Sequence, residues 1–434
     1  MGLQTQVPSA KAQQARADAR AAATRAHGAA LEMGLTTCDE RNAALSAMAC
    51  ALRAHAAEIE QANARDVERA RAGAVKESLV DRLALSAERI ESMAVALENL
   101  CDLPDPIGRE LERRTLYNGL DLTRVSVPLG VVAVVYEARP NVTADAAGIC
   151  LKAGNAVVLR GGSMAAESNA VIARVLSDAA TSEGLPEGCI EAVSSTDRAA
   201  TDELMVARGL VDVLIPRGGA GLIQHCVEHA TVPVIETGTG NCHVYVDRSA
   251  DLDAAQNVVV NAKCRRYGVC NACETLLVDE PIAEAFLPRV LAALVAHGVT
   301  IHADSRTRAI ADAAGIACEP ATEHDWATEY LAPEIAVRTV DGVDAAIDHI
   351  NRYGTKHSES IMAADEGACE RFAKRVDAAV VYTNASTAFT DGGQFGMGAE
   401  IGISTQKLHV RGPFALDGLT SYKYIVRGTG QVRA

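Results

Sequence analysis

The spacing of apolar residues divides the chain into regions of different period. Across residues 8–100 apolar positions recur at helical spacing, for example at Leu52, Ala56, Ile59 and Ala62, which predicts a run of helices. Residues 113–127 alternate between polar and apolar, which is typical of strands. The pair Asn118-Gly119 between the two halves of this stretch predicts a β-hairpin.

Beyond Gly130 the pattern changes to short, fully apolar segments separated by helical stretches. The apolar segments lie at residues 130–136, 156–160, 190–193, 211–215 and 232–235. A second series of this kind starts near Asp251 and has its strands at residues 275–278, 335–340 and 360–362. Apolar strands that alternate with helices are typical of parallel sheets covered on both faces. The pattern therefore predicts two α/β domains, followed by a glycine-rich stretch and a last strand at residues 421–426.

Composition narrows the class of protein. The 434 residues carry a net charge of -15, which argues against nucleic acid or an anionic membrane as a partner. No run of about 18 apolar residues predicts a transmembrane helix, and the first residues do not resemble a signal peptide. Twelve cysteines scattered over a long chain favour free thiols and a cytoplasmic protein.

One cysteine stands in a setting that favours chemistry over packing. Cys270 lies in a loop-like run with Gly268 just before it and the apolar strand 276–278 just after it. Arg265 and Arg266 lie upstream, and nearby positive charge favours the nucleophilic thiolate. Thirty-four positions earlier, the apolar segment Val234-Ile235 runs into Glu236 and a glycine turn. A loop cysteine with a carboxylate at a strand end suggests covalent acyl chemistry.

A metal or redox role for this cysteine is less well supported. Cys270 and Cys273 are formally a CxxC pair. A zinc site would require a second pair or histidines at matching spacing, and a thioredoxin-like pair would open a helix instead of leading into a strand. We therefore predict no metal site.

Two glycine pairs are candidates for a phosphate site. The GxxxxGK[ST] and GxGxxG signatures are absent, so neither a simple kinase nor a standard Rossmann site is predicted. Residues 159–163 (Leu-Arg-Gly-Gly-Ser) and 215–219 (Ile-Pro-Arg-Gly-Gly) each follow a buried strand and precede a helix. Backbone N–H groups in such a turn attract anions, and an arginine adds a fork of donors. An ordinary strand-to-helix turn with a solvated arginine is the alternative for each.

A polar residue after the first apolar strand also has two interpretations. Asn141 follows Arg139-Pro140, and its amide could donate to a developing oxyanion. It could instead cap the N-terminus of the following helix. The sequence leaves both roles open.

Several motifs together resemble a known superfamily. Glu236-Thr-Gly-Thr-Gly-Asn241, then residues 250–255, then Cys270 before a strand, resemble the aldehyde dehydrogenase superfamily. Residues 128–132, 329–333 and 392–398 agree with it in order. Within that superfamily the chain is most similar to the γ-glutamyl phosphate reductases, also called glutamate-5-semialdehyde dehydrogenases. The residues that carry this similarity are 136–143, 155–162, 215–219, 241–247, 349–354, 357–359 and 404–413.

The resemblance implies a reaction and a nucleophile. In that family a cysteine at the position of Cys270 attacks the acyl phosphate of L-glutamyl 5-phosphate and forms a thioester. NADPH then delivers a hydride, and glutamate 5-semialdehyde is released for proline biosynthesis. Asn141 and the backbone N–H of Cys270 are the implied oxyanion donors, and we assign Glu236 to positioning or a proton relay.

The resemblance also implies binding residues. Arg160 matches a position near the adenosine ribose of NADP. The next three residues, Gly161, Gly162 and Ser163, are further candidates for cofactor binding. Glu329 matches the glutamate that contacts the nicotinamide ribose. Arg217, Gly218 and Gly219 would lie near the pyrophosphate or the adenosine end. The candidate cations for the substrate's carboxylate and phosphate are Arg139, Arg266, Lys407 and Arg411.

The implied fold is aldehyde dehydrogenase-like, with two parallel-sheet α/β domains and a small β oligomerisation flap. We assign 1–112 and 128–247 to a cofactor-binding domain, 248–395 to a catalytic domain, and 113–127 with 396–434 to the flap and C-terminal strand. Exposed strand edges favour a homo-oligomer. A γ-glutamyl kinase is a possible transient partner, because the acyl phosphate is labile. The rival functions are a CoA-linked acylating aldehyde dehydrogenase and a catalytically silent scaffold of the same fold.

Overall fold

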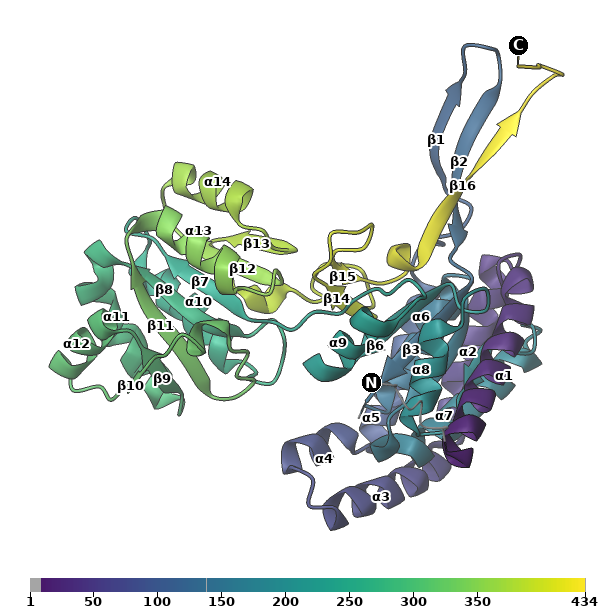
Figure 1. Ribbon diagram of the computed structural model, residues 1–434, viewed down its shortest axis with the longest axis horizontal. Coiled ribbons are helices and arrows are strands. Elements are labelled where there is room, and N and C mark those ends of the chain that lie inside the picture. Colours follow the sequence, from purple (N-terminus) through teal and green to yellow (C-terminus); the bar gives the residue numbers. More distant parts are fainter. Residues whose placement is uncertain (1–8, 138, 434) are drawn as a thin grey trace, which may run out of the picture. The chain divides into compact units, whose positions relative to one another are not determined.

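A computed structural model describes residues 9–137 and 139–433 of the chain (Figure 1). Residues 1–8, which the predicted cofactor-binding domain includes, lie outside this part. The described chain forms two compact units. Unit 1 comprises residues up to 237, 397–402 and the segment from 414 on, and unit 2 comprises residues 238–396 and 403–413.

The predicted helical region is confirmed in unit 1. Its helices are α1 (Ala10–Met33), α2 (Cys38–Ala54), α3 (Ala56–Ala72), α4 (Glu77–Leu83) and α5 (Ala87–Cys101). Helix α2 begins at a capping box, in which the Thr37 side chain accepts from the Glu40 N–H and the Glu40 carboxylate accepts from the Thr37 N–H. Such caps satisfy the N–H groups that a helix start leaves unpaired.

The first series of apolar segments forms a four-stranded parallel sheet. Its strands are β3 (Val131–Tyr136), β4 (Ala156–Gly161), β5 (Ile190–Ala192) and β6 (Val213–Arg217), in the order β5-β4-β3-β6. The connecting helices are α6 (Asn141–Lys152), α7 (Ala166–Ser182), α8 (Arg198–Val206) and α9 (Ala220–His229), and a short 3-10 turn η1 (Ser163–Ala165) precedes α7. Every residue of β3 is buried, as its uninterrupted apolar run predicted.

The predicted strand at residues 232–235 is wrong. This segment makes only an isolated bridge between Val234 and Leu214, with the Leu214 N–H donating to Pro233 and the Ile235 N–H donating to Leu214. Pro233 has no N–H to donate, which limits a continuous ladder here.

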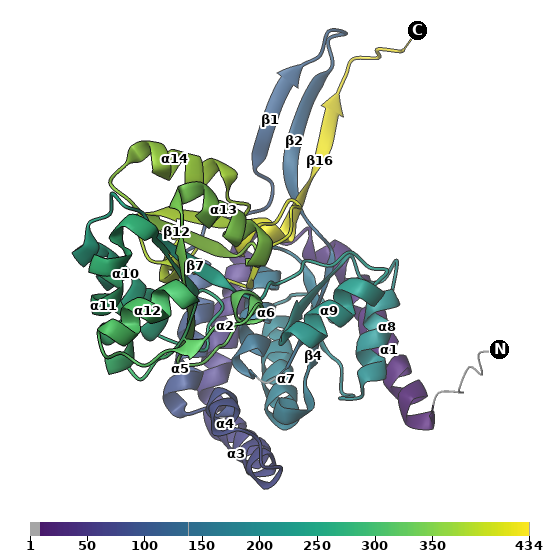
Figure 2. The same cartoon turned by 60° about the vertical axis from the view of Figure 1, so that its left-hand side comes forward.

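The predicted hairpin is confirmed and has a third strand. Strands β1 (Glu110–Thr115), β2 (Asp121–Pro128) and β16 (Thr420–Arg427) form an antiparallel sheet in the order β1-β2-β16. The three strands lie side by side in both views (Figures 1 and 2). Strand β1 begins at Glu110, three residues before the predicted start. Gly119 has a φ of 82° at the turn, where a glycine avoids the strain of the left-handed region.

The three predicted strands of the second series belong to a seven-stranded parallel sheet in unit 2, whose other four strands were not predicted. Its strands are β7 (Cys242–Val246), β8 (Cys273–Asp279), β9 (Thr300–Ala303), β10 (Glu319–Pro320), β11 (Glu334–Val340), β12 (Ser358–Met362) and β13 (Val380–Thr383). The strand order is β10-β9-β11-β8-β7-β12-β13. The helices are α10 (Leu252–Cys264), α11 (Glu280–Ala296), α12 (Ser305–Ala313), α13 (Gly342–Tyr353) and α14 (Glu366–Arg375), with 3-10 turns η2 (Asp325–Ala327) and η3 (Thr387–Phe389). Leu276, Val278, Phe286 and Leu291 pack in its core.

The domain boundaries differ from those predicted. Strand β7 was assigned to the cofactor-binding domain, but it pairs with β8 and β12 inside the second sheet, and unit 2 begins at Gly238. The predicted C-terminal segment 396–434 is also divided between the two units. Residues 403–413 belong to unit 2, and β14 (Gly402–Ser404) and β15 (Gly412–Phe414) pair with each other. A last 3-10 turn, η4 (Asp417–Leu419), leads into β16, which alone joins the hairpin.

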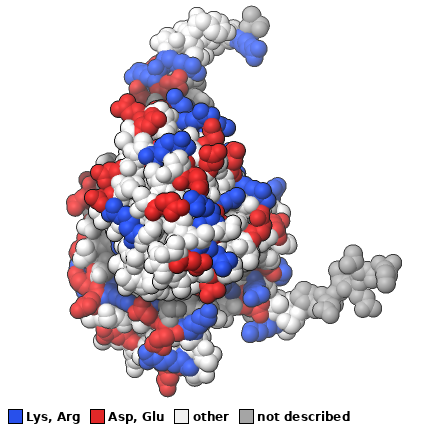
Figure 3. All heavy atoms as spheres, turned by 90° about the vertical axis from the view of Figure 1, so that its left-hand side faces the viewer, with Lys and Arg blue, Asp and Glu red and all other residues white. Residues whose placement is uncertain are grey.

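Surface charge on the face shown in Figure 3 is mixed, with acidic and basic side chains interspersed. This face therefore carries no broad basic patch. Among the described helices, none is long and apolar enough to cross a membrane.

Candidate active site

The candidate nucleophile lies in unit 2, in the loop between α10 and β8. Cys270 is partly exposed. Its carbonyl oxygen accepts a hydrogen bond from the Cys242 thiol at 3.1 Å. A Cβ at Gly240 would lie only 1.5 Å from this same oxygen, so no other residue fits at position 240 without moving the loop. The segment that leads into β7 thus supports the back of the Cys270 loop.

The residue after Cys270 ties the loop to a distant segment. The Asn271 amide nitrogen donates to the carbonyls of Thr390 at 3.0 Å and Ala388 at 3.3 Å. The Thr387 hydroxyl donates in turn to the Asn271 carbonyl at 2.7 Å. These three bonds fix the position of the Cys270 loop against η3.

Glu329 lies close to the same loop. Its Oε1 accepts from the Gly240 N–H at 2.6 Å. Burial raises the pKa of Glu329, and the Gly240 hydrogen bond opposes that rise. The structure therefore brings two of the predicted site residues, Cys270 and Glu329, close to the same residue, Gly240.

A buried ion pair supports this region, and the sequence analysis missed it. Lys263 Nζ lies 2.5 Å from Glu274 Oε2, and both side chains are fully buried. The other Glu274 oxygen accepts from the Leu331 N–H, two residues after Glu329. Burial raises the pKa of Glu274 to about 7, against the opposing effect of Lys263. The available signal was Glu274, a single charge at the start of the apolar segment that follows Cys270.

A second buried polar cluster lies between β7 and β12. Glu359 Oε2 accepts from the His243 backbone N–H at 2.7 Å and from its Nδ1 at 2.9 Å. His357 Nδ1 lies 2.8 Å from the Ser358 hydroxyl, which donates to Thr390. Thr390 also accepts from Asn271, so this cluster connects to the nucleophile loop. The sequence analysis used these residues for the resemblance but gave them no role.

In unit 1 the two predicted glycine turns meet, and they meet at a residue that the sequence analysis did not single out. The Gly162 N–H donates to the Glu137 carbonyl at 3.2 Å, and the Gly219 N–H donates to the Glu137 carboxylate at 2.9 Å. A Cβ at Gly218 would lie 2.7 Å from that carboxylate. The anion at the start of α9 is thus the chain's own Glu137, because this N–H and the helix dipole attract negative charge.

The other members of the glycine turns lie nearby in the same unit. Arg217 ends β6 and is partly buried, with a guanidinium nitrogen 3.1 Å from where a Gly402 Cβ would lie. Ser163 is exposed at the start of η1. Gly161 has no room for a side chain, because a Cβ would lie 2.1 Å from the Asn169 amide nitrogen.

A cavity of about 440 Å³ opens beside these turns in unit 1. Its walls include Tyr136 and Gly161 at the carboxyl ends of β3 and β4, and Asn169 of α7. The Asn169 oxygen accepts from the Thr143 hydroxyl at 3.1 Å. Its amide nitrogen is buried and has no hydrogen-bond partner within the described chain. An unsatisfied buried donor in the wall of a cavity favours a ligand with an acceptor.

Arg160 is held by backbone carbonyls instead of facing this cavity. One guanidinium nitrogen donates to Thr196 at 2.8 Å and to Asp197 at 3.1 Å. The residue is 8% exposed, and burial lowers its pKa. The cations among the lining residues are Arg25 and Arg174.

Asn141 does not cap helix α6. Pro140 is the N-cap residue, and the Asn141 amide nitrogen donates to Asp145 at 2.9 Å. Burial raises the pKa of Asp145 to about 6. The N-cap interpretation is therefore wrong. Asn141 and Glu236 belong to unit 1 and Cys270 to unit 2, so their predicted cooperation stays a prediction.

Two of the four candidate substrate cations share one carboxylate. Lys407 lies 2.7 Å and Arg411 2.8 Å from the same carboxylate, that of Asp377. The bond to Lys407, and then that to Arg411, lowers the pKa of Asp377 to about 2. Arg139 and Arg266 are exposed. Among the described residues, no group of three or more His, Cys, Asp or Glu side chains could hold a metal ion.

Comparison with known proteins shows which family the chain belongs to. A model of the aldehyde dehydrogenase family matches residues 4–312. The chain belongs to the aldehyde dehydrogenase family. This confirms the predicted family and its α/β fold.

Within this family the chain is similar to γ-glutamyl phosphate reductases. It is 57% identical to the one from Moorella thermoacetica, over 92% of this chain and 94% of the relative. It is 53% identical to the one from Thermobifida fusca, over 96% and 99%. The crystal structure of the Thermotoga maritima protein of that name is 45% identical and superposes with a TM-score of 0.92, covering 98% of this chain and all of the other.

Proposed function

We propose that this member of the family reduces L-glutamyl 5-phosphate to L-glutamate 5-semialdehyde and phosphate with NADPH, a step of proline biosynthesis. The observation that carries the proposal is the similarity to proteins named γ-glutamyl phosphate reductase, at 50–57% identity over at least 92% of the chain. The partly exposed Cys270 in a rigidly supported loop supports it.

The chain's own residues carry the acyl transfer. The Cys270 thiolate attacks the γ-carbonyl, a C–S bond forms, and the C–O bond to phosphate breaks with its electron pair leaving on phosphate. The backbone N–H of Cys270 and the Asn141 amide would stabilise the oxyanion. An amide nitrogen has two hydrogens, so the bond from Asn141 to Asp145 leaves one donor for this role.

The nicotinamide cofactor, when bound, supplies the hydride that reduces the thioester. The Cys270 thiolate then leaves as the aldehyde forms, so no acid is needed for this cleavage. A cavity of about 440 Å³ suits part of a dinucleotide, and the unsatisfied Asn169 amide would donate to it. Glu329 would contact the nicotinamide ribose. For the 2′-phosphate of NADP the candidates are Arg160, whose guanidinium donates to two backbone carbonyls, and the cavity-lining residues Arg25 and Arg174, which are paired with Glu191 and Glu58.

Glu236 is kept as a positioning residue. A reductase that uses an acyl phosphate gains nothing from activating water against its own thioester. The partly buried Glu236 follows the single-bridge segment at Val234, which fixes its backbone. Its role is to orient groups near the reacting centre.

Assembly with a second copy is also proposed. Strands β1 and β16 are the outer strands of their sheet, and Tyr422, Tyr424 and Val426 on β16 are each about half exposed. Unpaired strand edges with apolar side chains favour pairing between copies. Light scattering with size-exclusion chromatography tests this, and the same measurement with a γ-glutamyl kinase added tests the transient partnership.

The reaction is tested in reverse. We expect the wild-type protein to reduce NADP⁺ with glutamate 5-semialdehyde only when inorganic phosphate is present, as followed by absorbance. Turnover that depends on CoA instead would establish the CoA-linked alternative. Folded, reduced protein without any turnover would favour the scaffold.

A further inference from the structure

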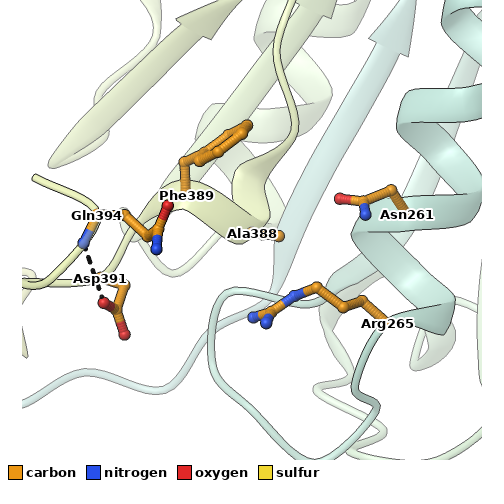
Figure 4. A pocket seen from close by; sticks show the side chains of 6 residues that line it. All are labelled: Asn261, Arg265, Ala388, Phe389, Asp391 and Gln394. Atoms are coloured by element: carbon orange, nitrogen blue, oxygen red, sulfur yellow. Dashed lines mark hydrogen bonds between the residues drawn. The ribbon is translucent and has the colours of Figure 1, made fainter.

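A second cavity lies wholly within unit 2, beside the nucleophile loop. Its volume is about 230 Å³, and it is lined by Asn261, Arg265, Ala388, Phe389, Asp391 and Gln394. Figure 4 shows the side chains of Asn261 and Arg265 extending from the end of α10 toward the segment 388–394, with Asp391 and Gln394 on the opposite side. The walls therefore come from two distant parts of the sequence.

Among the described residues, the two charges of this cavity, those of Arg265 and Asp391, have no charged partner. Within the described chain, Arg265 makes no side-chain hydrogen bond or ion pair, in contrast to Lys407 and Arg411, which share Asp377. Asp391 Oδ1 accepts from the backbone N–H groups of Gly393 at 2.9 Å and Gln394 at 3.2 Å. These bonds fix the Asp391 carboxylate but leave its charge without a cation among the described residues.

A cavity with one cation, one anion and two amides complements a zwitterion. An α-amino acid carries a carboxylate and an ammonium group on one carbon. The forked guanidinium of Arg265 suits a carboxylate, and Asn261 can add a donor. The Asp391 carboxylate suits the ammonium group, and Gln394 can either donate or accept.

The cavity is mechanically joined to Cys270. Asn271, the next residue, donates to the carbonyls of Ala388 and Thr390. Ala388 lines the cavity, and Arg265 lies five positions before Cys270, at the C-terminal cap of α10. A ligand held here is thus positioned by the same structure that fixes the nucleophile loop.

We propose that this cavity binds the α-carboxylate and α-ammonium groups of the substrate, with Arg265 and Asn261 on the carboxylate and Asp391 on the ammonium. The proposal rests on the proposed function and assigns its specificity for an amino acid. It replaces Lys407 and Arg411 as candidates for the carboxylate, because their charges are already paired with Asp377.

The test compares three aldehydes in the phosphate-dependent reverse reaction. Glutamate 5-semialdehyde carries both groups, 4-aminobutanal lacks the carboxylate, and 5-oxopentanoate lacks the ammonium. For Arg265→Ala we expect kcat/KM with glutamate 5-semialdehyde to fall about 10- to 100-fold, because a charge-assisted hydrogen bond to the carboxylate is lost. With 4-aminobutanal, which has no carboxylate, we expect a fall of less than about threefold. Arg265→Lys should recover part of the loss.

The reciprocal variant tests the other wall. Asp391→Asn should lose activity toward glutamate 5-semialdehyde but not toward 5-oxopentanoate. Lys374→Ala, which removes a surface charge of α14 in the same unit, is the matched control and should leave all three values unchanged. Thermal unfolding of each variant establishes that it is folded.

Several outcomes would overturn the proposal. An equal loss with all three aldehydes would make Arg265 a support of the loop and not a ligand of the carboxylate. A carboxylate-specific loss in Arg266→Ala, with none in Arg265→Ala, would move the site to the neighbouring arginine. An unchanged Arg265→Ala beside an active wild type would reject this site alone, whereas an inactive wild type would reject the proposed function.

Discussion

The unit 1 sheet has a wholly apolar interior strand, β3, and buries a cation, Arg160, near the end of β4, whereas the unit 2 sheet buries carboxylates within β8 and β12. Strand β3 reads Val-Val-Ala-Val-Val-Tyr and is buried throughout. Strands β8 and β12 are equally buried but contain Glu274 and Glu359. Burying a charge is costly unless it is paired and hydrogen-bonded. The two parallel sheets therefore differ in where they bury charge: near the end of one strand in unit 1, and within two strands in unit 2.

The difference follows what each unit must hold in place. Unit 1 leaves space, through glycines in its turns and a cavity beside them. Unit 2 fixes a loop, through buried hydrogen bonds that converge on residues 270 and 271. A cavity that accepts a ligand tolerates an apolar scaffold. A nucleophile that must be held within a fraction of an ångström requires directional bonds behind it.

The largest effect should come from the proposed nucleophile, Cys270. Cys270→Ala should lower kcat of the reverse reaction at least about 10³-fold, because no other group in its loop can form the thioester. Cys318→Ala, which removes a partly buried thiol elsewhere in unit 2, should keep near wild-type activity. Residual turnover above one per cent in Cys270→Ala would mean that another residue is the nucleophile.

The buried ion pair should come next. Lys263→Met leaves Glu274 unpaired in the interior, and we expect a loss of about 3–5 kcal/mol in the free energy of unfolding at neutral pH. The double variant Lys263→Met/Glu274→Leu should recover most of it, because no buried charge remains. Chemical denaturation measures both. A double variant as unstable as the single one would show that packing, and not charge, dominates here.

Buried histidines should make unit 2 sensitive to acid. His357 is fully buried, and burial lowers its pKa to about 4. Between about pH 6.5 and 4 the unfolded chain binds a proton at this side chain that the folded chain does not, so stability falls as the pH falls. His357→Gln should reduce this loss of stability by about 1–3 kcal/mol, which is the size expected for one group with a lowered pKa.

The matched control for this measurement is His324→Gln, at an exposed histidine of the same unit. Thermal midpoints from pH 7 to pH 4 give the slope for each protein. Slopes that agree for wild type and His357→Gln would reject a neutral buried histidine at position 357.

The smallest effect should come from the cavity of unit 1. Asn169→Ala removes the unsatisfied amide donor, and we expect KM for NADP⁺ to rise about 10-fold with kcat little changed. This is the expected result because the lost hydrogen bond would be made equally in the ground state and in the transition state. Gln224→Ala, on the exposed surface of α9, is the control. A fall in kcat with KM unchanged would place Asn169 in the chemistry and not in cofactor binding.

The periodicity predicted most of the fold for a simple reason. An amphipathic helix and a buried parallel strand differ in period, so the helical run of residues 8–100 and strands β3 to β6, β8, β11 and β12 could be predicted from the sequence. Strands β7, β9, β10 and β13 were not predicted. The predicted strand at residues 232–235 was wrong because the prediction relied on the apolar run alone. That run contains Pro233, which has no N–H to donate to a neighbouring strand. The assignment of β7 to unit 1 was wrong because a strand's sequence does not specify its neighbours in the sheet.

The site divides in the same way. Sequence by itself singled out Cys270 as the candidate nucleophile, because its loop, glycine and flanking charges are local features, and it supplied the motifs that identify the family. Only the tertiary structure decided the contacts: Glu137 at the glycine turns, Lys263 with Glu274, Asp377 with Lys407, and Arg265 facing Asp391 across a cavity. Each joins residues separated by between 11 and 126 positions, and which side chains meet at such a separation depends on how the strands are ordered and not on any local pattern.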